Sequence, residues 1–287
     1  MISLDKKNRI TNKLFLTAIK AEVVFTIVIL LLIIGYISLR GIFKGGNIKN
    51  GINLSFEYLF TPTHDSGKTG GIIAIVFNTF VLVLLVALIA SPIGIGSAIW
   101  LSNDSRSKHL KQIVKSFIEV LASIPSIIFG LFGMIVFVGL FNLGYSLISG
   151  VLTLTIMVLP TIISTSENAI KGVDNNLILA SIGLGATKAE TIFKVTLKMC
   201  KRGMLSGVIL AIGRAIGETA ALIYTVGSSC EVATSLTSSA RPLAMHIYLG
   251  INEGQSFDKS FQGAFVLMIM LLLINTISRK LMRINKN

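Results

Sequence analysis

The stretch GMLSGVILAIGRAIGETAALIYTVG, residues Gly203–Gly227, decides the fold prediction, because it is apolar enough to span a membrane yet contains Arg214 and Glu218. A charge in hydrocarbon costs about 2.5–3.5 kcal/mol even on a lenient insertion scale, so such residues face a bundle interior or a polar path. At about 100° per residue, one helix face collects the small and polar residues Gly203, Gly207, Arg214, Glu218, Ala221 and Thr225. The opposite face collects Leu205, Ile209, Ile212, Ile216 and Ile223. The stretch is predicted to be a helix that lines a bundle interior or a polar path.

The composition places the chain among integral membrane proteins. Of its 287 residues 53% are hydrophobic and 14% are charged, whereas a soluble domain has about 25% charged residues. The net charge of +13 raises the question of nucleic acid, but the basic residues form short clusters between apolar runs. Positive loops on the cytoplasmic side of a membrane explain that pattern better, and no nucleic-acid partner is predicted.

Six apolar segments predict an all-α protein with six transmembrane helices, at residues 16–39, 72–100, 113–138, 147–165, 203–227 and 261–277. Both termini and the loops 101–115 and 166–202 contain most of the 26 Lys and Arg residues. The positive-inside rule therefore places these parts in the cytoplasm. Cys200 and Cys230 then lie on opposite sides of the membrane, and no disulfide is predicted.

Several chemistries are excluded by pattern. SGKTGG, residues 66–71, lacks the glycine of a phosphate-binding loop, since Pro62 occupies that position. His64, His109 and His246 are too far apart to suggest a metal site. No nucleophile–base constellation or paired acids suggest an enzyme.

Residues 166–202 are too polar to span a membrane but follow a helical pattern. Asp174 or Asn175 can cap a first short amphipathic helix, and a second one is predicted to meet it at Gly183 and Gly185. The segment leads directly into the charged stretch Gly203–Gly227.

Residues 173–202 resemble the EAA loop of type I binding-protein-dependent ABC importer permeases. The matching positions are Ala180, Ser181, Gly185, Ala186, Val195 and Leu197, while Leu179 replaces the expected Glu and Lys198 the expected Pro. The runs RAIGETAAL (214–222), PIGIGSAIWL (92–101) and IEVLASIPSIIFGLFGM (118–134) are similar to the PstA family of phosphate-specific transporters. The resemblance covers nearly all of residues 70–280.

This resemblance implies a type I ABC importer permease fold with cytoplasmic coupling helices. Residues 71–280 would form the permease domain, after an N-terminal part (1–70) and before a cytoplasmic tail (281–287). The implied partners in the cell membrane are a homologous PstC-like permease, two PstB-like ATPase subunits and an extracytoplasmic PstS-like phosphate-binding protein. ATP would bind to the ATPase subunits, and this chain would hold no cofactor. The alternatives are a permease for phosphonate or molybdate, a self-contained channel, or a membrane-embedded enzyme.

The resemblance also implies roles for individual residues. Arg214 would offer a bidentate fork to phosphate, and Glu218, one turn away, would pair with it when no phosphate is bound. Thr225 would complete this substrate pathway. The residues expected to dock on the ATPase are Ala180, Ser181, Gly183, Gly185, Ala186, Val195 and Leu197. The alternative is a structural ion pair and a plain surface loop.

Four further residues are predicted to be structural. Asn78 and Asn275 are expected to join helices by hydrogen bonds, and Pro125 to kink the third helix. Glu119 is expected to pair with Lys115, which lies four residues before it.

Overall fold

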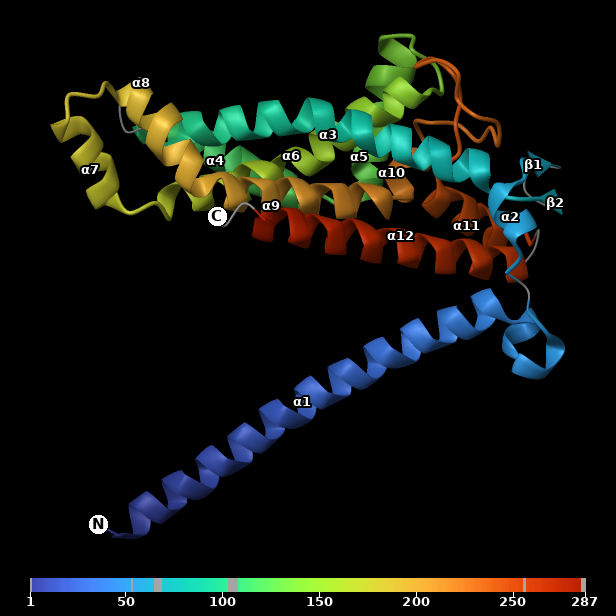
Figure 1. The fold of residues 1–287 in the computed structure, drawn as a ribbon, viewed down its shortest axis with the longest axis horizontal. Coiled ribbons are helices and arrows are strands. Elements are labelled where there is room, and N and C mark those ends of the chain that lie inside the picture. Colours follow the sequence, from blue (N-terminus) through green and yellow to red (C-terminus); the bar gives the residue numbers. More distant parts are fainter. Residues whose placement is uncertain (1, 53, 65–68, 103–107, 255–256, 285–287) are drawn as a thin grey trace.

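The computed structural model describes residues 2–52, 54–64, 69–102, 108–254 and 257–284, which form an elongated helical bundle (Figure 1). Part of the SGKTGG run and the end of the predicted tail lie outside these residues. The α-helices are α1 (Ile2–Ile42), α2 (Phe56–Phe60), α3 (Ile73–Ser102), α4 (Lys108–Ser123), α5 (Ser126–Gly133), α6 (Leu147–Lys171), α7 (Asn175–Gly183), α8 (Lys188–Thr191), α9 (Leu197–Ile216), α10 (Ala220–Ile223), α11 (Leu243–Asn252) and α12 (Phe257–Ile284).

Short elements complete the fold. Two 3-10 turns, η1 (Lys44–Gly46) and η2 (Ile48–Asn50), follow α1, and the strands β1 (Thr63–His64) and β2 (Thr69–Gly70) pair antiparallel. Two π-helical stretches, η4 (Met134–Leu140) and η5 (Ile192–Thr196), extend α5 and precede α9. Both chain termini lie toward the same end of the bundle as α7 and α8 (Figure 1).

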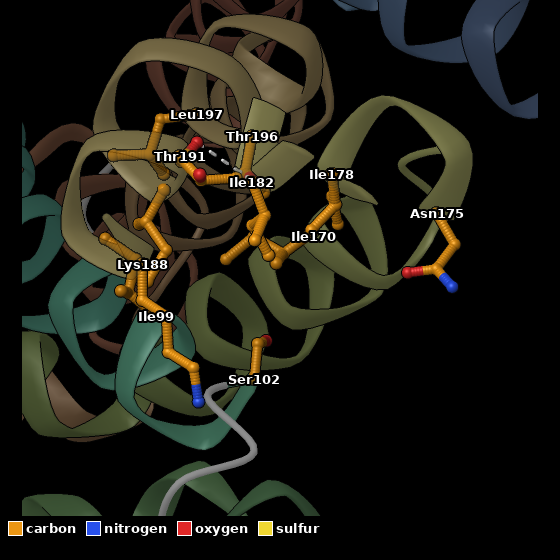
Figure 2. A pocket seen from close by; sticks show the side chains of 11 residues that line it. Ile99, Ser102, Ile170, Asn175, Ile178, Ile182, Lys188, Thr191, Thr196 and Leu197 are labelled. Atoms are coloured by element: carbon orange, nitrogen blue, oxygen red, sulfur yellow. Dashed lines mark hydrogen bonds between the residues drawn. The ribbon is translucent and has the colours of Figure 1, made fainter. Parts of the chain in front are cut away.

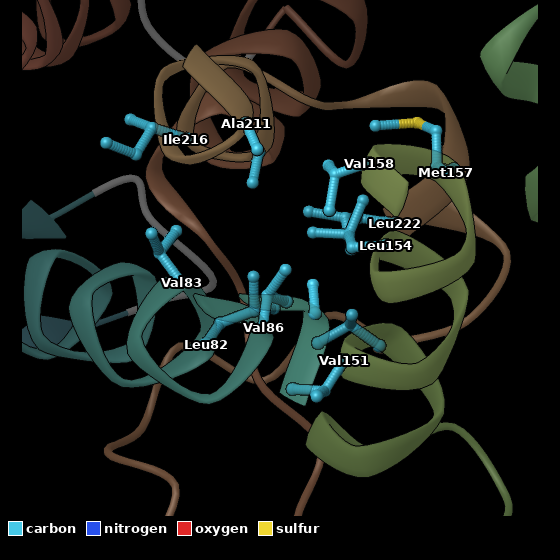
Figure 3. Close-up of a cluster of buried hydrophobic side chains, with 14 of the residues drawn as sticks. Leu82, Val83, Val86, Val151, Leu154, Met157, Val158, Ala211, Ile216 and Leu222 are labelled. Atoms are coloured by element: carbon cyan, nitrogen blue, oxygen red, sulfur yellow. The ribbon is translucent and has the colours of Figure 1, made fainter. Parts of the chain in front are cut away.

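The core lies where α3, α6 and α9 pack together. Leu82, Leu154, Val158 and Leu222 are almost completely buried there (Figure 3). Small residues bring the helices close: a Cβ atom at Gly207 of α9 would lie 2.9 Å from Thr165 Cβ of α6. Close backbone approach at glycine is how helices associate in a membrane, where the lipid is as apolar as the side chains.

The all-α membrane prediction is confirmed, and the count of six spans is approximate. Four helices among the described residues are long and apolar enough to cross a membrane, namely 14–42, α3, α6 and 257–280. The pair formed by α4 and the helix 126–140 would be a fifth span. The predicted span 203–227 corresponds to α9 and α10, but α9 ends at Ile216 and begins among Lys198, Lys201 and Arg202.

The third predicted helix is broken and not merely kinked. The segments 108–123 and 126–140 are bent by 101° relative to each other. Pro125 lies at the N-cap of α5. Proline has no N–H group to donate and disfavours helical geometry in the residue before it, here Ile124, so the helix ends at Ser123.

The first helix separates from the bundle. It contacts α12 through its last turns, where Gly41 packs against Phe265 and the Tyr36 ring meets the Phe261 ring edge-on at 5.7 Å. The Arg40 guanidinium lies 5.2 Å from the centre of the Phe261 ring. The most apolar part of α1 has no residue buried by the rest of the chain. Figure 1 shows α1 diverging from α12 toward the N-terminus.

Asn78 joins α3 to the loop 228–240, not to another helix. Its side chain is completely buried, its Nδ2 donates to the Glu231 carbonyl at 2.8 Å, and its Oδ1 accepts from the Ala233 N–H at 2.9 Å. Asn275, for which the same role was predicted, is exposed on α12. Asn78 therefore holds the loop against the bundle.

His246 is a buried titratable group on α11, outside the spanning segments. Its side chain is 5% exposed, and Nδ1 has no hydrogen-bond partner. Burial, together with the positive charges of Arg241 and Lys259, lowers the pKa of His246 to about 4. The imidazole is therefore neutral in the folded protein at neutral pH.

We expect Asn78→Leu to lower the free energy of unfolding by about 1–3 kcal/mol, because the part-buried N–H of Ala233 and carbonyl of Glu231 lose their partner. Thermal unfolding in detergent, with limited proteolysis of the loop 228–240, measures this. Asn275→Leu is the control and should change neither. Equal effects of the two substitutions would contradict the assigned role of Asn78.

We expect the folded protein to lose stability as the pH falls below the ordinary histidine pKa. In that pH range His246 binds a proton in the unfolded chain but stays neutral in the folded protein. The free energy of unfolding therefore falls by about 2 kcal/mol between about pH 7.5 and about pH 5. His246→Phe should reduce this loss, measured by thermal unfolding at both pH values, whereas His109→Phe on exposed α4 should not. An unchanged loss in His246→Phe would refute the assignment.

Candidate functional site

Arg214 lies in the last turn of α9, and its side chain is exposed in this chain. A cation there complements the partial negative charge of the helix C-terminus. The helix ends two residues later at Ile216, and Gly217–Thr219 separate it from α10. The guanidinium group is therefore presented at a break in a helix, not along a continuous helical face.

The predicted division of this stretch into a polar and a lipid face is wrong. Gly203 packs against Ala169 and Gly207 against Thr165, both on α6, so these glycines serve close helix packing. Ile216, expected to face lipid, is 2% exposed. The small residues let α9 approach α6 closely.

The predicted pairing of Arg214 with Glu218 is also wrong. The break removes the helical spacing between them, and none of the ion pairs among the described residues joins these two side chains. The Glu218 carboxylate instead accepts a hydrogen bond from the Ala221 N–H at 3.2 Å. It thereby satisfies a free N–H group at the start of α10.

Thr225 is buried behind α5 and does not share an exposed surface with Arg214. Its Oγ1 donates to the Ala221 carbonyl at 2.9 Å, and its own carbonyl accepts from the Ser146 N–H at 3.1 Å. A Cβ atom at Gly133 of α5 would lie 2.8 Å from Thr225 Cγ2. The Thr225 hydroxyl and carbonyl therefore both have hydrogen-bond partners within the protein.

The two broken helices meet where α5 packs against α10. A Cβ atom at Gly130 of α5 would lie only 2.9 Å from Ala221 Cα of α10, so the two backbones are in contact. Non-helical backbone at membrane depth is tolerated only where protein or a water-filled cavity surrounds it. Broken helices of this kind form the substrate sites of many transporters, since their ends expose charge and polar backbone groups.

The segment between α6 and α9 folds as two short helices joined at a turn. The Asp174 side chain accepts from the Asn176 N–H at 2.9 Å and caps α7, as predicted. Gly185 adopts a φ of +87°, a left-handed conformation that glycine adopts without strain. Thr187 and Glu190 form a capping box at the start of α8. The Thr187 N–H and Lys194 hold the pKa of Glu190 at about 2.

Several large apolar side chains are exposed on α7 and in the turn after it. Leu184 is 90% exposed, and Leu177, Leu179 and Ile182 are also exposed. Of the residues predicted to dock on the ATPase, Ala180, Gly183 and Gly185 are exposed, whereas Ser181, Ala186, Val195 and Leu197 are half-buried. The Ser181 hydroxyl lies 3.0 Å from the Thr191 hydroxyl and joins α7 to α8.

A cavity of about 220 Å³ lies beneath α7 (Figure 2). Its lining residues are mostly aliphatic and come from α3, α6, α7, α8, η5 and α9: Ile99, Ser102, Ile170, Asn175, Ile178, Ile182, Lys188, Thr191, Ile192, Thr196 and Leu197. None of the α7 residues is buried. The helix therefore covers a hollow and is not packed into the core.

Glu167 is the charged residue that the sequence analysis missed. Its Oε1 accepts from Lys115 Nζ at 3.2 Å and from Lys171 Nζ at 2.6 Å. Lys115 therefore pairs with Glu167 and not, as predicted, with Glu119, which is exposed. The spacing of Glu167 and Lys171 was a usable signal, but the predicted helix ended before Glu167.

The part of the chain that the structure describes has no group of three or more His, Cys, Asp or Glu side chains that could hold a metal ion. His246 lies on α11. His109 lies on α4, where it lines an open groove with Gln112. The charged groups at the break are an arginine and a carboxylate. Such a site suits an anion better than a metal ion.

Comparison with known proteins gives a consistent result. Residues 90–286 match the family model described as binding-protein-dependent transport system inner membrane component. The chain is 33% identical over 249 residues to the probable ABC transporter permease protein YqgI of Bacillus subtilis, covering 81% of this chain and 85% of that protein.

Two further relatives have names that state a substrate. The phosphate transport system permease protein PstA 2 of Mycobacterium tuberculosis is 34% identical over 228 residues, covering 78% of this chain and 75% of the relative. The phosphate transport system permease protein PstC of Pasteurella multocida is 33% identical over 245 residues, with 76% of each chain covered.

The fold is similar to that of a solved transporter. A chain of the inward-facing MetNI methionine ABC transporter superposes with a TM-score of 0.65, covering 75% of this chain and 96% of that one. The sequence identity is 18%, so this likeness concerns the fold alone.

Proposed function

Because the chain belongs to the family of binding-protein-dependent transport system inner membrane components, we propose that it is the PstA-type permease subunit of an ATP-driven phosphate importer. Members of this family are non-enzymatic, multi-pass membrane subunits of ABC importers, and this chain is such a subunit. The proposal adds the substrate, the partners, the orientation and the roles of individual residues.

Phosphate is the substrate that the named relatives favour. PstA and PstC relatives are about equally similar to this chain, so identity alone does not separate the two subunits. Ala220 and Ala221, which follow the RAIGET run, favour the PstA type. Because a guanidinium fits any tetrahedral oxyanion, phosphonate and molybdate are the competitors that an experiment has to include.

The observation that carries the proposal is the position of Arg214. An exposed guanidinium stands at the end of α9, beside two broken helices that touch at Gly130 and Ala221. In a single subunit this group has an open side, and a second permease would enclose it. A passing phosphate would then exchange its water for the planar fork of Arg214.

Glu218 and Thr225 have revised roles in this pathway. Glu218 fixes the start of α10 next to Arg214 and so shapes the path without neutralising the guanidinium. Thr225 could reach the path only if α10 moved away from α5, since it is buried between them in this conformation. We therefore place Arg214 in contact with phosphate and assign the other two to the walls of the path.

The α7–α8 segment is the proposed docking site for an ATPase subunit. Its exposed leucines form an apolar surface at the end of the bundle where both termini lie (Figure 1). The basic residues gathered at that end support a cytoplasmic position for it and for both termini. ATP would bind to two ATPase subunits there, while an extracytoplasmic binding protein delivers phosphate at the other end and this chain holds no cofactor.

We expect Arg214→Gln to reduce ATP-dependent phosphate uptake about tenfold or more, since a lost charge-assisted hydrogen bond is worth about 1.5–3 kcal/mol. The measurement is uptake of labelled phosphate by proteoliposomes containing the full complex, with molybdate and phosphonate as competitors. Arg214→Lys should retain part of the activity, and Lys201→Gln, at the other end of α9, should retain all of it. Normal uptake by Arg214→Gln would remove Arg214 from the pathway.

We expect Leu184→Asp to weaken retention of the ATPase subunits about tenfold or more, because a charge replaces the most exposed leucine of the docking surface. Co-purification of ATPase subunits with a tagged permease measures this. Val232→Asp, in the loop 228–240 at the opposite end, is the control. Full retention by Leu184→Asp would exclude this surface as the docking site.

A further inference from the structure

Glu167 joins two lysines near the α7 end of the bundle, and the pathway proposed above does not use it. The residue lies four positions before Lys171, the last residue of α6, and its side chain is 7% exposed. One carboxylate oxygen accepts from Lys171 of the same helix and from Lys115 of α4. The carboxylate therefore makes one contact within α6 and one between helices.

The two ion pairs have different mechanical consequences. A buried carboxylate remains charged only when cations or hydrogen bonds compensate it, and Glu167 has two ammonium groups for this. The pair with Lys171 links residues one helical turn apart and places no constraint on α4. The pair with Lys115 does fix α4 against α6.

The contact between α4 and α6 is loosely packed at this level. A polar cavity of about 170 Å³ lies beside the ion pair, lined by Lys115, Ile118, Glu119, Ser164, Glu167 and Asn168. Ile118 of α4 packs with Ile163 of α6 on the side of the apolar cluster. Side chains leave this cavity unfilled, and the Lys115–Glu167 pair holds α4 against α6 there, alongside the apolar contact at Ile118.

This pair lies between the proposed docking segment and the broken helices. Toward the docking segment, α6 ends at Lys171, and α7 begins at Asn175 after three residues. In the other direction, α4 leads through the break at Pro125 into α5, which touches α10 at Gly130. A displacement of α6 that α4 follows would therefore reach α10, which follows the break after Arg214.

We propose that the Lys115–Glu167 pair makes α4 follow α6 when the α7–α8 segment is displaced, which makes Glu167 a positioning residue for transport. The inference rests on the proposed function, which supplies the displacement through the ATPase subunits. Without the pair, ATP hydrolysis continues but moves less phosphate. The quantity that changes is the amount of phosphate transported per ATP hydrolysed.

The experiment compares Lys115→Met with Lys171→Met in the full complex reconstituted in proteoliposomes. Each variant removes one ammonium group and leaves Glu167 with the other, so neither leaves a bare buried carboxylate. Lys115→Met should lower the phosphate transported per ATP about fivefold or more, the size of a typical coupling between sites. Lys171→Met should leave this ratio unchanged, as should Glu119→Gln in the same cavity, and Lys115→Arg should restore it.

Poor assembly alone would lower transport and hydrolysis together and leave the ratio unchanged. A normal ratio in Lys115→Met, alongside an active unsubstituted complex, would overturn the inference. If the unsubstituted complex moves no phosphate, the proposed function fails. The Lys115–Glu167 link between α4 and α6 is then still tested by the distance between spin labels at Gln112 on α4 and Gly172 after α6. A distribution that broadens in Lys115→Met but not in Lys171→Met supports it, and equal distributions refute it.

Discussion

A helix end buried among apolar side chains has to find partners for its free polar groups, and the start of α6 shows how this bundle meets that requirement. The Ser146 N–H donates to the Thr225 carbonyl at 3.1 Å, Leu147 to Ser238 at 2.9 Å and Ile148 to Leu236 at 2.9 Å. These carbonyls come from the segment that follows α10. Unsatisfied N–H groups in hydrocarbon cost several kcal/mol each, so α6, α10 and the loop 228–240 form one unit.

The same requirement explains why the two broken helices, α4–α5 and α9–α10, pack against each other. Each break frees backbone groups that lipid cannot satisfy, so each must lie against protein or a polar path. Glu218 supplies one partner from within the chain by accepting from the Ala221 N–H. The glycine contact at Gly130 brings the second broken helix against the first and covers part of the exposed backbone. Arg214 stands at the side that this chain leaves open.

The sequence was informative where local chemistry decides the structure. The apolar runs, the Asp174 cap and the turn at Gly185 follow from propensity and spacing, and the structure has each of them. Sequence spacing failed at Gly217–Thr219, because a continuous helical pattern hides a break that tertiary contacts decide. It also failed for Lys115, since Glu119 is its neighbour in sequence but Glu167 is its partner in space. The faces of α9 were misassigned because a glycine suits a polar path and tight helix packing equally well.

The hollow beneath α7 determines by which route a force on that helix can travel. A helix with no buried residue, lying over a cavity of about 220 Å³, offers few side-chain contacts with the core through which a force could pass. The backbone from Thr187 to Ile216 is helical almost throughout, passing from α8 through η5 into α9. The main chain therefore carries such a force, through the continuous helix from α8 to α9 on one side of α7 and through the short link to α6 on the other. Resistance to compression along the axis of α9 would set how far Arg214 moves for a given displacement at the membrane surface.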